Sequence, residues 1–326
     1  MALSCCFHRH VAQLRHQGAT EANAGPAMAV LHLNSDWRNV SGIIAAARAL
    51  PPGVPLIVMI HGYRFCPFSP THDPHRHILA LDPTLPGPRL RSWPAALGMR
   101  GEDGALGIAF GWPARGGLGR VYHRAGVIGR DLGQWIGALA EAAGRPVQVI
   151  GHSLGGRVAL QAMAGAPAGS VGRIILLAAA ELRPAAEAAM DSPAGRGAEV
   201  INVTSRENDL FDFAMELVVS RGRHAALGFG LSQPRPNWLD LQIDAPEPRA
   251  ALAGLGFDIG AETARACHWS PYLRAGLFDF YRVALGQPWA LPLRLLRAHL
   301  PERQAPRWSR LLQLPGRPAA PHGAQG

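Results

Sequence analysis

One strand-like run that turns directly into a helix-like run constrains this chain more than any other feature. The stretch PVQVIGHSLGGRVALQAMAG covers residues 146–165, and its apolar, β-branched start predicts a strand while its end predicts a helix. Gly151 and Gly155 stand two residues either side of Ser153. A tight strand-to-helix turn brings neighbouring backbone so close that side chains at these glycines would clash. The pattern therefore predicts that Ser153 is lifted above the edge of a sheet, with the N–H of Leu154 at the start of the helix.

Other short apolar runs predict the sheet to which this turn belongs. We expect strands at residues 55–60, 104–112, 146–150, 171–180, 198–205 and 238–243. Helix patterns occupy residues 122–143, 154–164 and 184–190. Continuous apolar runs suit strands that are buried on both faces, and strands that alternate with helices favour a parallel sheet. The sequence therefore predicts an α/β fold, a mostly parallel central sheet with helices on both faces.

The chain divides into three predicted parts. Residues 1–27 are expected to be a poorly ordered N-terminal extension, residues 28–286 the α/β domain, and residues 287–326 a basic tail rich in proline and leucine. Within the domain, residues 64–104 are rich in proline and histidine and predict a lid-like loop. Met28 opens directly onto strand-like sequence, so translation could start there or at Met1.

Composition argues against several classes of protein. The chain of 326 residues is 48% hydrophobic and 17% charged, which is enough apolar material for a full core. Its net charge is +9, but every basic residue is an arginine and these are scattered, so we expect no nucleic-acid partner. No apolar run reaches membrane-spanning length, and the first residues lack the apolar region of a signal peptide. The four cysteines form no disulfide or metal pattern, which favours a reducing compartment, and we predict a cytoplasmic protein.

At these residues the chain resembles the α/β-hydrolase superfamily, particularly its lipase- and esterase-like members. GHSLGG matches the G-x-S-x-G nucleophile elbow, IVMIHGYRF (residues 57–65) is similar to the first oxyanion segment, and FGWP (residues 110–113) to a later strand end. The resemblance covers roughly residues 54–273 and implies an α/β-hydrolase fold. It also implies a serine hydrolase that cleaves a carboxylic ester through an acyl-enzyme. An acyltransferase or amide or thioester hydrolase on the same scaffold, or a peripheral membrane-binding protein, is the alternative.

The resemblance implies a catalytic triad in the chain order serine, acid, histidine. Ser153 would be the nucleophile and His268, in CHWSPYL, the base, with His224 as the alternative base. Asp209 follows a predicted strand in SREND and would be the acid, while Asp212 is the runner-up. A helix N-cap is the structural role that competes for Asp209.

Other residues are expected around this triad. By the resemblance, the backbone N–H groups of Leu154 and Tyr63 would bind the oxyanion, and His61 would orient the oxyanion loop. His152 lies inside the elbow and could line the acyl pocket. The substrate-pocket candidates are His61, His152, Phe65 and Phe68.

Three histidines of the lid-like loop raise the question of a metal. His72, His75 and His77 lie in THDPHRH, whose spacing matches no zinc site, and serine chemistry needs no metal. We therefore expect no metal and no cofactor. The expected partner is a small-molecule or lipid-like ester, with at most weak membrane-surface contact through residues 291–314, where arginine and leucine interleave. The sequence leaves the oligomeric state open.

Overall fold

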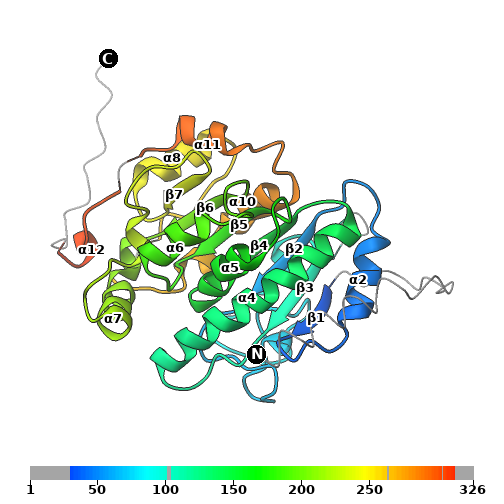
Figure 1. The fold of residues 1–326 in the computed structure, drawn as a ribbon. Helices are drawn as coiled ribbons and strands as arrows, with labels where there is room; N and C mark the ends of the chain where they lie inside the picture. Colours follow the sequence, from blue (N-terminus) through cyan, green and yellow to red (C-terminus); the bar gives the residue numbers. More distant parts are fainter. Residues whose placement is uncertain (1–29, 101–103, 263, 303, 313–326) are drawn as a thin grey trace.

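The computed structural model describes residues 30–100, 104–262, 264–302 and 304–312. Its centre is one seven-stranded sheet with the strand order β1-β3-β2-β4-β5-β6-β7, in which all neighbours are parallel (Figure 1). The strands are β1 Val30–Asn34, β2 Leu56–Ile60, β3 Leu106–Gly111, β4 Val147–His152, β5 Val171–Leu177, β6 Glu199–Thr204 and β7 Trp238–Gln242. The predicted parallel α/β sheet is thereby confirmed.

Helices cover both faces of the sheet, as predicted (Figure 1). One core lies against α2 Val40–Arg48, α4 Leu118–Ala143, α5 Leu154–Gly165 and α6 Arg183–Met190. The other lies against α3 Trp93–Ala96, α8 Pro246–Gly254, α9 Ser270–Leu273, α10 Leu277–Gly286 and α11 Leu293–His299. After β6, the 3-10 turn η2 Arg206–Asn208 leads into α7 Asp209–Ser220, and the short α12 is Ser309–Leu312. Two further 3-10 turns are η1 Pro74–Arg76 and η3 Leu227–Phe229.

Strand β2 shows why a continuous apolar run is needed here. All five of its residues are buried. Val58 and Ile60 belong to the core beneath α4 and α5, while Ile57 and Met59 belong to the opposite core. Successive side chains of a strand point to opposite faces, so a strand covered on both sides favours apolar residues at every position.

Glycines let α4 and α5 approach each other closely on one face. A Cβ built at Gly133 would stand 2.3 Å from the carbonyl oxygen of Ala162, and one at Gly129 would stand 2.7 Å from that of Val158. Both contacts are shorter than any non-bonded carbon–oxygen approach allows. Helix α5, which begins directly after Ser153, is therefore held against α4 at a separation that only glycine permits.

The lid-like loop and the tail are packed more firmly than the sequence suggests. The loop contains η1 and α3, and its Ile78, Leu79 and Trp93 are fully buried in the second core. In the tail, Leu293 and Leu296 of α11 are buried in the same core. The described part of 287–326 thus packs on the domain, because its leucines recur at helical spacing and cover the sheet. The predicted extension, residues 1–27, lies outside the described residues, as does Met28.

No helix in the described part of the chain is both long and apolar enough to cross a membrane.

The close approach of α4 and α5 gives a first prediction. Gly133→Ala should lower the free energy of unfolding by about 1–3 kcal/mol, the usual cost of overpacking. Gly42→Ala is the matched control, because Gly42 lies in α2 with nothing within 4 Å of the added methyl group. Gly42→Ala should raise the free energy of unfolding by about 1 kcal/mol, because alanine has a higher helix propensity than glycine. Urea denaturation would measure both, and equal effects of the two substitutions would contradict the packing argument.

Candidate active site

Ser153 is held in a strained backbone conformation at the turn from β4 into α5. Its φ of 54° and ψ of −124° lie outside the regions that residues with side chains normally occupy. Its N–H donates to the carbonyl of Leu177 at 3.0 Å, and its own carbonyl accepts from the N–H groups of Gly156 and Ala180, both at 2.9 Å. Three backbone hydrogen bonds therefore fix the strained residue, as is common where strain serves a function.

The two glycines flanking Ser153 stand in the crowded positions that the sequence argument requires. A Cβ at Gly155 would lie 2.4 Å from the carbonyl oxygen of Ile60 and 2.6 Å from that of His61. A Cβ at Gly151 would lie 2.5 Å from the carbonyl oxygen of Gly155. A side chain at Gly155 would push the elbow away from the end of β2, and a side chain at Gly151 would push the start of α5 away from β4.

Two backbone N–H groups beside Ser153 are available to a ligand. Leu154 opens α5, and the first N–H groups of a helix have no partner within it. The N–H of Tyr63 has no hydrogen-bond partner among the residues that the structure describes. Leu154, Tyr63 and Ser153 line one cavity. The Tyr63 side chain points away to donate its hydroxyl to the carbonyl of Gly116.

His61 holds the end of β2 against β3 and does not line the cavity for which it was a candidate. Its Nε2 accepts from the N–H of Trp112 at 3.0 Å, so the proton is on Nδ1, which donates to the carbonyl of Gly62 at 2.9 Å. Burial lowers the pKa of His61 to about 4, which keeps the ring neutral. His61 therefore fixes the loop that carries Tyr63, the role that the resemblance implies.

His268 is positioned by three neighbours. Its Nδ1 lies 2.6 Å from Oδ1 of Asn208, and its ring stacks on Phe211 with centroids 4.6 Å apart. His152, directly before Ser153, donates from Nε2 to the carbonyl of His268 at 2.9 Å. Burial lowers the pKa of His268 well below its ordinary value, and the charges of His152 and Arg89 act in the same direction. The ring is therefore a neutral base at physiological pH.

The residue against His268 is Asn208, and the predicted acid Asp209 points elsewhere. Its Oδ2 accepts from the N–H of Trp308 at 2.6 Å, and its Oδ1 lies 3.4 Å from the guanidinium of Arg206. Asn208 ends the 3-10 turn η2, where about three residues make a turn, so neighbouring side chains point roughly 120° apart. A shift of one residue in the assignment thus moves the side chain out of the site.

Asp212, the runner-up for the acid, contacts His268 only through Asn208. The Asn208 Nδ2 donates to Asp212 Oδ1 at 3.0 Å. With its amide nitrogen used in this way, Asn208 presents its oxygen to His268, whose Nδ1 must then be the donor. The lone pair on Nε2 of His268 is left free, which is the tautomer a general base requires.

Burial raises the pKa of Asp212 to about 7, and the charge of Arg206 only partly opposes this. The negative charge of Asp209 acts in the same direction as burial. The second oxygen of Asp212, Oδ2, is buried without a hydrogen-bond partner in the described structure, so hydrogen bonding offsets its desolvation only in part. Asp212 therefore changes its charge close to physiological pH, one side chain away from His268.

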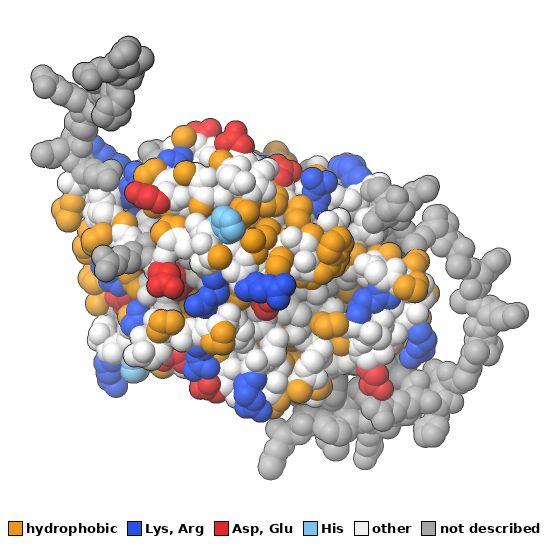
Figure 2. All heavy atoms as spheres, turned by 90° about the horizontal axis from the view of Figure 1, so that it is seen from above, with side chains coloured by type: hydrophobic (Ala, Val, Ile, Leu, Met, Phe, Trp, Pro, Cys, Tyr) orange, Lys and Arg blue, Asp and Glu red, His pale blue; other side chains and the backbone are white. Residues whose placement is uncertain are grey.

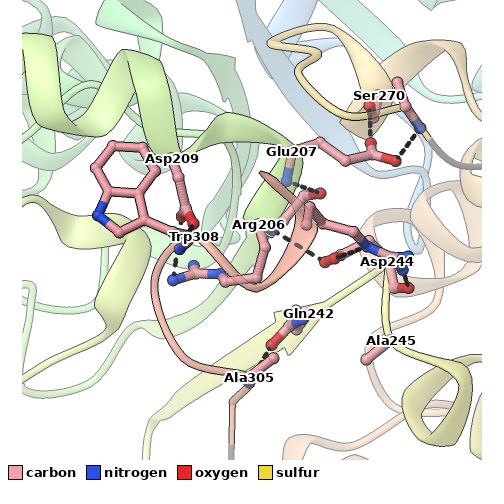
Figure 3. Close-up of polar contacts among 12 residues, drawn as sticks. Arg206, Glu207, Asp209, Gln242, Asp244, Ala245, Ser270, Ala305 and Trp308 are labelled. Atoms are coloured by element: carbon pink, nitrogen blue, oxygen red, sulfur yellow. Dashed lines mark hydrogen bonds and ion pairs between the residues drawn. The ribbon is translucent and has the colours of Figure 1, made fainter. Parts of the chain in front are cut away.

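Glu207 ties the His268 loop to the same turn. Its carboxylate accepts two hydrogen bonds from Arg274, both at 3.0 Å, and one from the N–H of Ala264 at 2.8 Å. It also accepts from the hydroxyl of Ser270 (Figure 3). The backbone carbonyl of Glu207 accepts from the N–H of Cys267 at 2.8 Å. The ion pair with Arg274 is almost fully buried. Both sides of His268 in sequence are therefore anchored to Glu207.

The C-terminal segment 304–312 explains where Asp209 points. Figure 3 shows this segment running across η2, with the backbone of Trp308 beside the Asp209 carboxylate and that of Ala305 beside Gln242. The segment also carries Arg307, which pairs with Glu216, and Arg310, which pairs with Asp244 at 2.8 Å. We name residues 304–312 the C-terminal strap.

The candidate residues meet in one cavity of about 530 Å³. Ser153, His268 and Asn208 all line it, and among the described residues no hydrogen bond joins the Ser153 hydroxyl to His268. Such bonds often tighten only when substrate is bound. Of the pocket candidates, Phe65 and His152 line the cavity, whereas Phe68 does not and is 55% exposed.

The described residues contain no cluster of three or more histidine, cysteine, aspartate or glutamate side chains able to hold a metal ion. His75 pairs with Asn34 at 2.7 Å, His72 with Thr71 at 2.8 Å, and His77 packs beside Phe65, so these histidines point to different partners. On the face shown in Figure 2, basic side chains are scattered among apolar and acidic ones and form no continuous stripe.

Sequence reasoning missed Asn208 because it searched the segment SREND for carboxylates only. The position of Asn208 shortly after a buried strand could have identified it, because a short turn there brings the last residue of the turn to the edge of the sheet. It also missed Phe211, Trp269 and Arg89, which line the cavity but belong to no motif.

Comparison with known proteins identifies no family for this chain. No family model matches the chain, and no curated protein matches it either. Among solved structures, the chain is similar to lipase B of Aspergillus fumigatus, with 13% sequence identity and a TM-score of 0.38. The match covers 78% of this chain and 60% of the lipase chain, so the chain spans less than two thirds of that protein. A likeness this weak carries no argument about activity.

The raised pKa of Asp212 gives a second prediction. The folded state favours the protonated form of Asp212. The contribution of Asp212 to the free energy of unfolding is therefore fully present below the unfolded pKa of 3.8 and is lost as pH rises through about 7. Asp212→Asn keeps the shape of the neutral form. It should therefore raise the melting temperature by several degrees at about pH 8 and much less at about pH 5.

Asp279→Asn is the control for this experiment, because Asp279 is exposed on α10. It should change the melting temperature little at either pH. If the gain from Asp212→Asn were the same at both pH values, a buried carboxyl that titrates near neutrality would be ruled out.

Proposed function

We propose that the protein is a serine hydrolase that cleaves a carboxylic ester through an acyl-enzyme intermediate. One observation carries the proposal: strained Ser153, at the strand-to-helix turn, shares a cavity with His268, a neutral histidine whose Nδ1 is already engaged. A serine hydroxyl needs a base with a free lone pair and donors for the oxyanion, and these roles are supported by His268, Leu154 and Tyr63, which line the same cavity.

The proposed reaction begins with proton transfer from the Ser153 hydroxyl to Nε2 of His268. The Ser153 oxygen bonds to the ester carbonyl carbon, and the carbonyl oxygen becomes an oxyanion held by the N–H groups of Leu154 and Tyr63. The carbon–oxygen bond to the alcohol then breaks, and His268 returns the proton to the leaving oxygen. Water repeats the cycle on the acyl-serine and releases the carboxylic acid.

The acid of the triad is replaced by a pair of side chains in this proposal. Asn208 orients His268, and Asp212 lies behind it, so the charge that stabilises the imidazolium acts through an amide. An amide in the orienting position is known from Cys-His-Asn proteases. Because Asp212 ionises near neutrality, the acid limb of the activity profile should reflect its pKa of about 7.

The cavity wall supports a substrate with an apolar acyl part. Phe65, Ile78, Phe211, Met215 and Trp269 all line it. A small-molecule or lipid-like ester is therefore the proposed substrate class. Cytoplasmic location stays a prediction. So does weak membrane contact of the tail, in which Trp289 and Leu312 are exposed apolar residues.

A third prediction concerns the nucleophile. A fluorophosphonate probe should label the wild-type protein on Ser153, and Ser153→Ala should not be labelled. Ser170→Ala is the matched control, since Ser170 precedes β5 at the opposite end of the sheet. It should be labelled like the wild type. Labelling of Ser153→Ala, with the modified serine mapped by mass spectrometry, would remove Ser153 from the mechanism.

A fourth prediction separates Asn208 from Asp209. Asn208→Ala should lower kcat/KM for an ester by on the order of 10²-fold or more, the contribution of a correctly positioned acid–base group. Asp209→Asn should lower the melting temperature, because it weakens the contact with Trp308, and change kcat/KM less than tenfold. Circular dichroism would check that both variants fold. The opposite ranking would return the orienting role to Asp209.

A further inference from the structure

Two arginines line the candidate active-site cavity without an acidic partner. Neither Arg64 nor Arg89 forms an ion pair with any described residue, although both are exposed at the cavity. The acidic residue in the cavity wall is Asp212, and its carboxylate is turned to Asn208. The cavity therefore presents two uncompensated positive charges to whatever enters it.

Arg89 is held in place by a neighbour of the candidate base. Its guanidinium carbon lies 3.2 Å from the centroid of the Trp269 ring, which is a close cation–π contact. Trp269 follows His268 directly and also lines the cavity. A guanidinium stacked in this way loses little further freedom when it binds an anion, and its fork of N–H groups suits a carboxylate or phosphate.

Arg64 lines the same cavity from the loop that follows β2. It follows Tyr63, its φ is 79°, and its N–H donates to the carbonyl of Ala114 at 2.8 Å. A left-handed conformation is costly for a residue with a side chain, so this backbone hydrogen bond helps to maintain it. Its side chain is exposed and lines the cavity that Tyr63 and Leu154 also line.

From these contacts we propose that the natural substrate is an ester whose alcohol part carries an anionic group, which Arg89 and Arg64 bind. This inference rests on the proposed hydrolase function. His268 gives its proton to the leaving oxygen, so the alcohol part of the ester must lie against His268. Arg89 stacks on the next residue in the chain and therefore faces that side of the substrate. Carboxylate and phosphate share the chemistry that this site recognises.

Matched esters test the proposal. We would compare 4-(butyryloxy)benzoate, whose alcohol part is anionic, with its neutral methyl ester, and measure the ratio of their kcat/KM values. Arg89→Gln should lower this ratio about 10-fold relative to wild type, and Arg64→Gln should lower it less. Intrinsic reactivity cancels because each protein is tested on both esters. The wild-type ratio should also fall as NaCl is added.

Arg91→Gln is the control, because Arg91 stacks on Phe278 and does not line the cavity. It should leave the ratio unchanged. A third ester, the mono-4-nitrophenyl ester of succinic acid, carries its charge on the acyl side. If Arg89→Gln lowered hydrolysis of this ester most, the placement on the alcohol side would be wrong. If no arginine substitution changed any ratio, the anion site would be overturned.

Binding separates failure of this inference from failure of the proposed function. Calorimetry on Ser153→Ala would compare affinity for 4-(butyryloxy)benzoate and its methyl ester without turnover. Tighter binding of the anion that is lost in the Ser153→Ala, Arg89→Gln double variant supports the site even if no ester is cleaved. Rapid hydrolysis of neutral esters with equal binding of both ligands would retain the hydrolase and discard the anion site.

Discussion

The close approach of α5 to the end of β2 is the constraint from which the candidate site follows. Carbonyl oxygens of Ile60 and His61 would lie 2.4 and 2.6 Å from a Cβ at Gly155, so only glycine allows the contact. Because β2 leads straight into the loop that carries Tyr63, the same contact places that loop beside Ser153. The strained turn and the loop with the free N–H group are therefore one packing arrangement, and a side chain at Gly155 would disrupt both.

The turn after β6 joins this arrangement to the rest of the domain. Each of its four consecutive residues contacts a different part of the domain. Arg206 contacts Asp244, and Glu207 contacts the loop that carries His268. Asn208 contacts the His268 ring, and Asp209 contacts the C-terminal strap. Their directions follow from the tight winding of a 3-10 turn. The buried Glu207–Arg274 pair is costly to break, since either charge alone would be left without a partner. The position of His268 therefore depends on a charge pair that contacts neither Ser153 nor the ring itself.

The fold could be predicted from the sequence because periodicity records burial directly. The apolar runs at residues 55–60 and 171–180 had no alternative to strands covered on both faces, and β2 and β5 are such strands. The role of the glycines around Ser153 could also be predicted, because crowded backbone at a tight turn leaves no room for a side chain. The position of the Asn208 side chain could not be predicted from the sequence. Whether residue 208 or 209 faces the cavity depends on a 3-10 turn and on the strap about 100 residues later in the chain. Arg64 and Arg89 could not be identified for a similar reason, because only the structure shows that they line the cavity and form no ion pair with a described residue.

An amide at position 208 is consistent with a cavity that receives an anion. Asn208 lines the cavity, so a carboxylate there would face the substrate and repel an anionic ester through a medium of low dielectric constant. The carboxylate of Asp212 also belongs to the cavity wall but is turned toward Asn208, so the Nδ1 proton of His268 is oriented by a neutral amide. The cost is visible in Asp212, whose pKa of about 7 reflects burial without full hydrogen bonding. On the proposed function, the neutral amide against His268 and the two arginines that have no acidic partner among the described residues both favour an anionic ester.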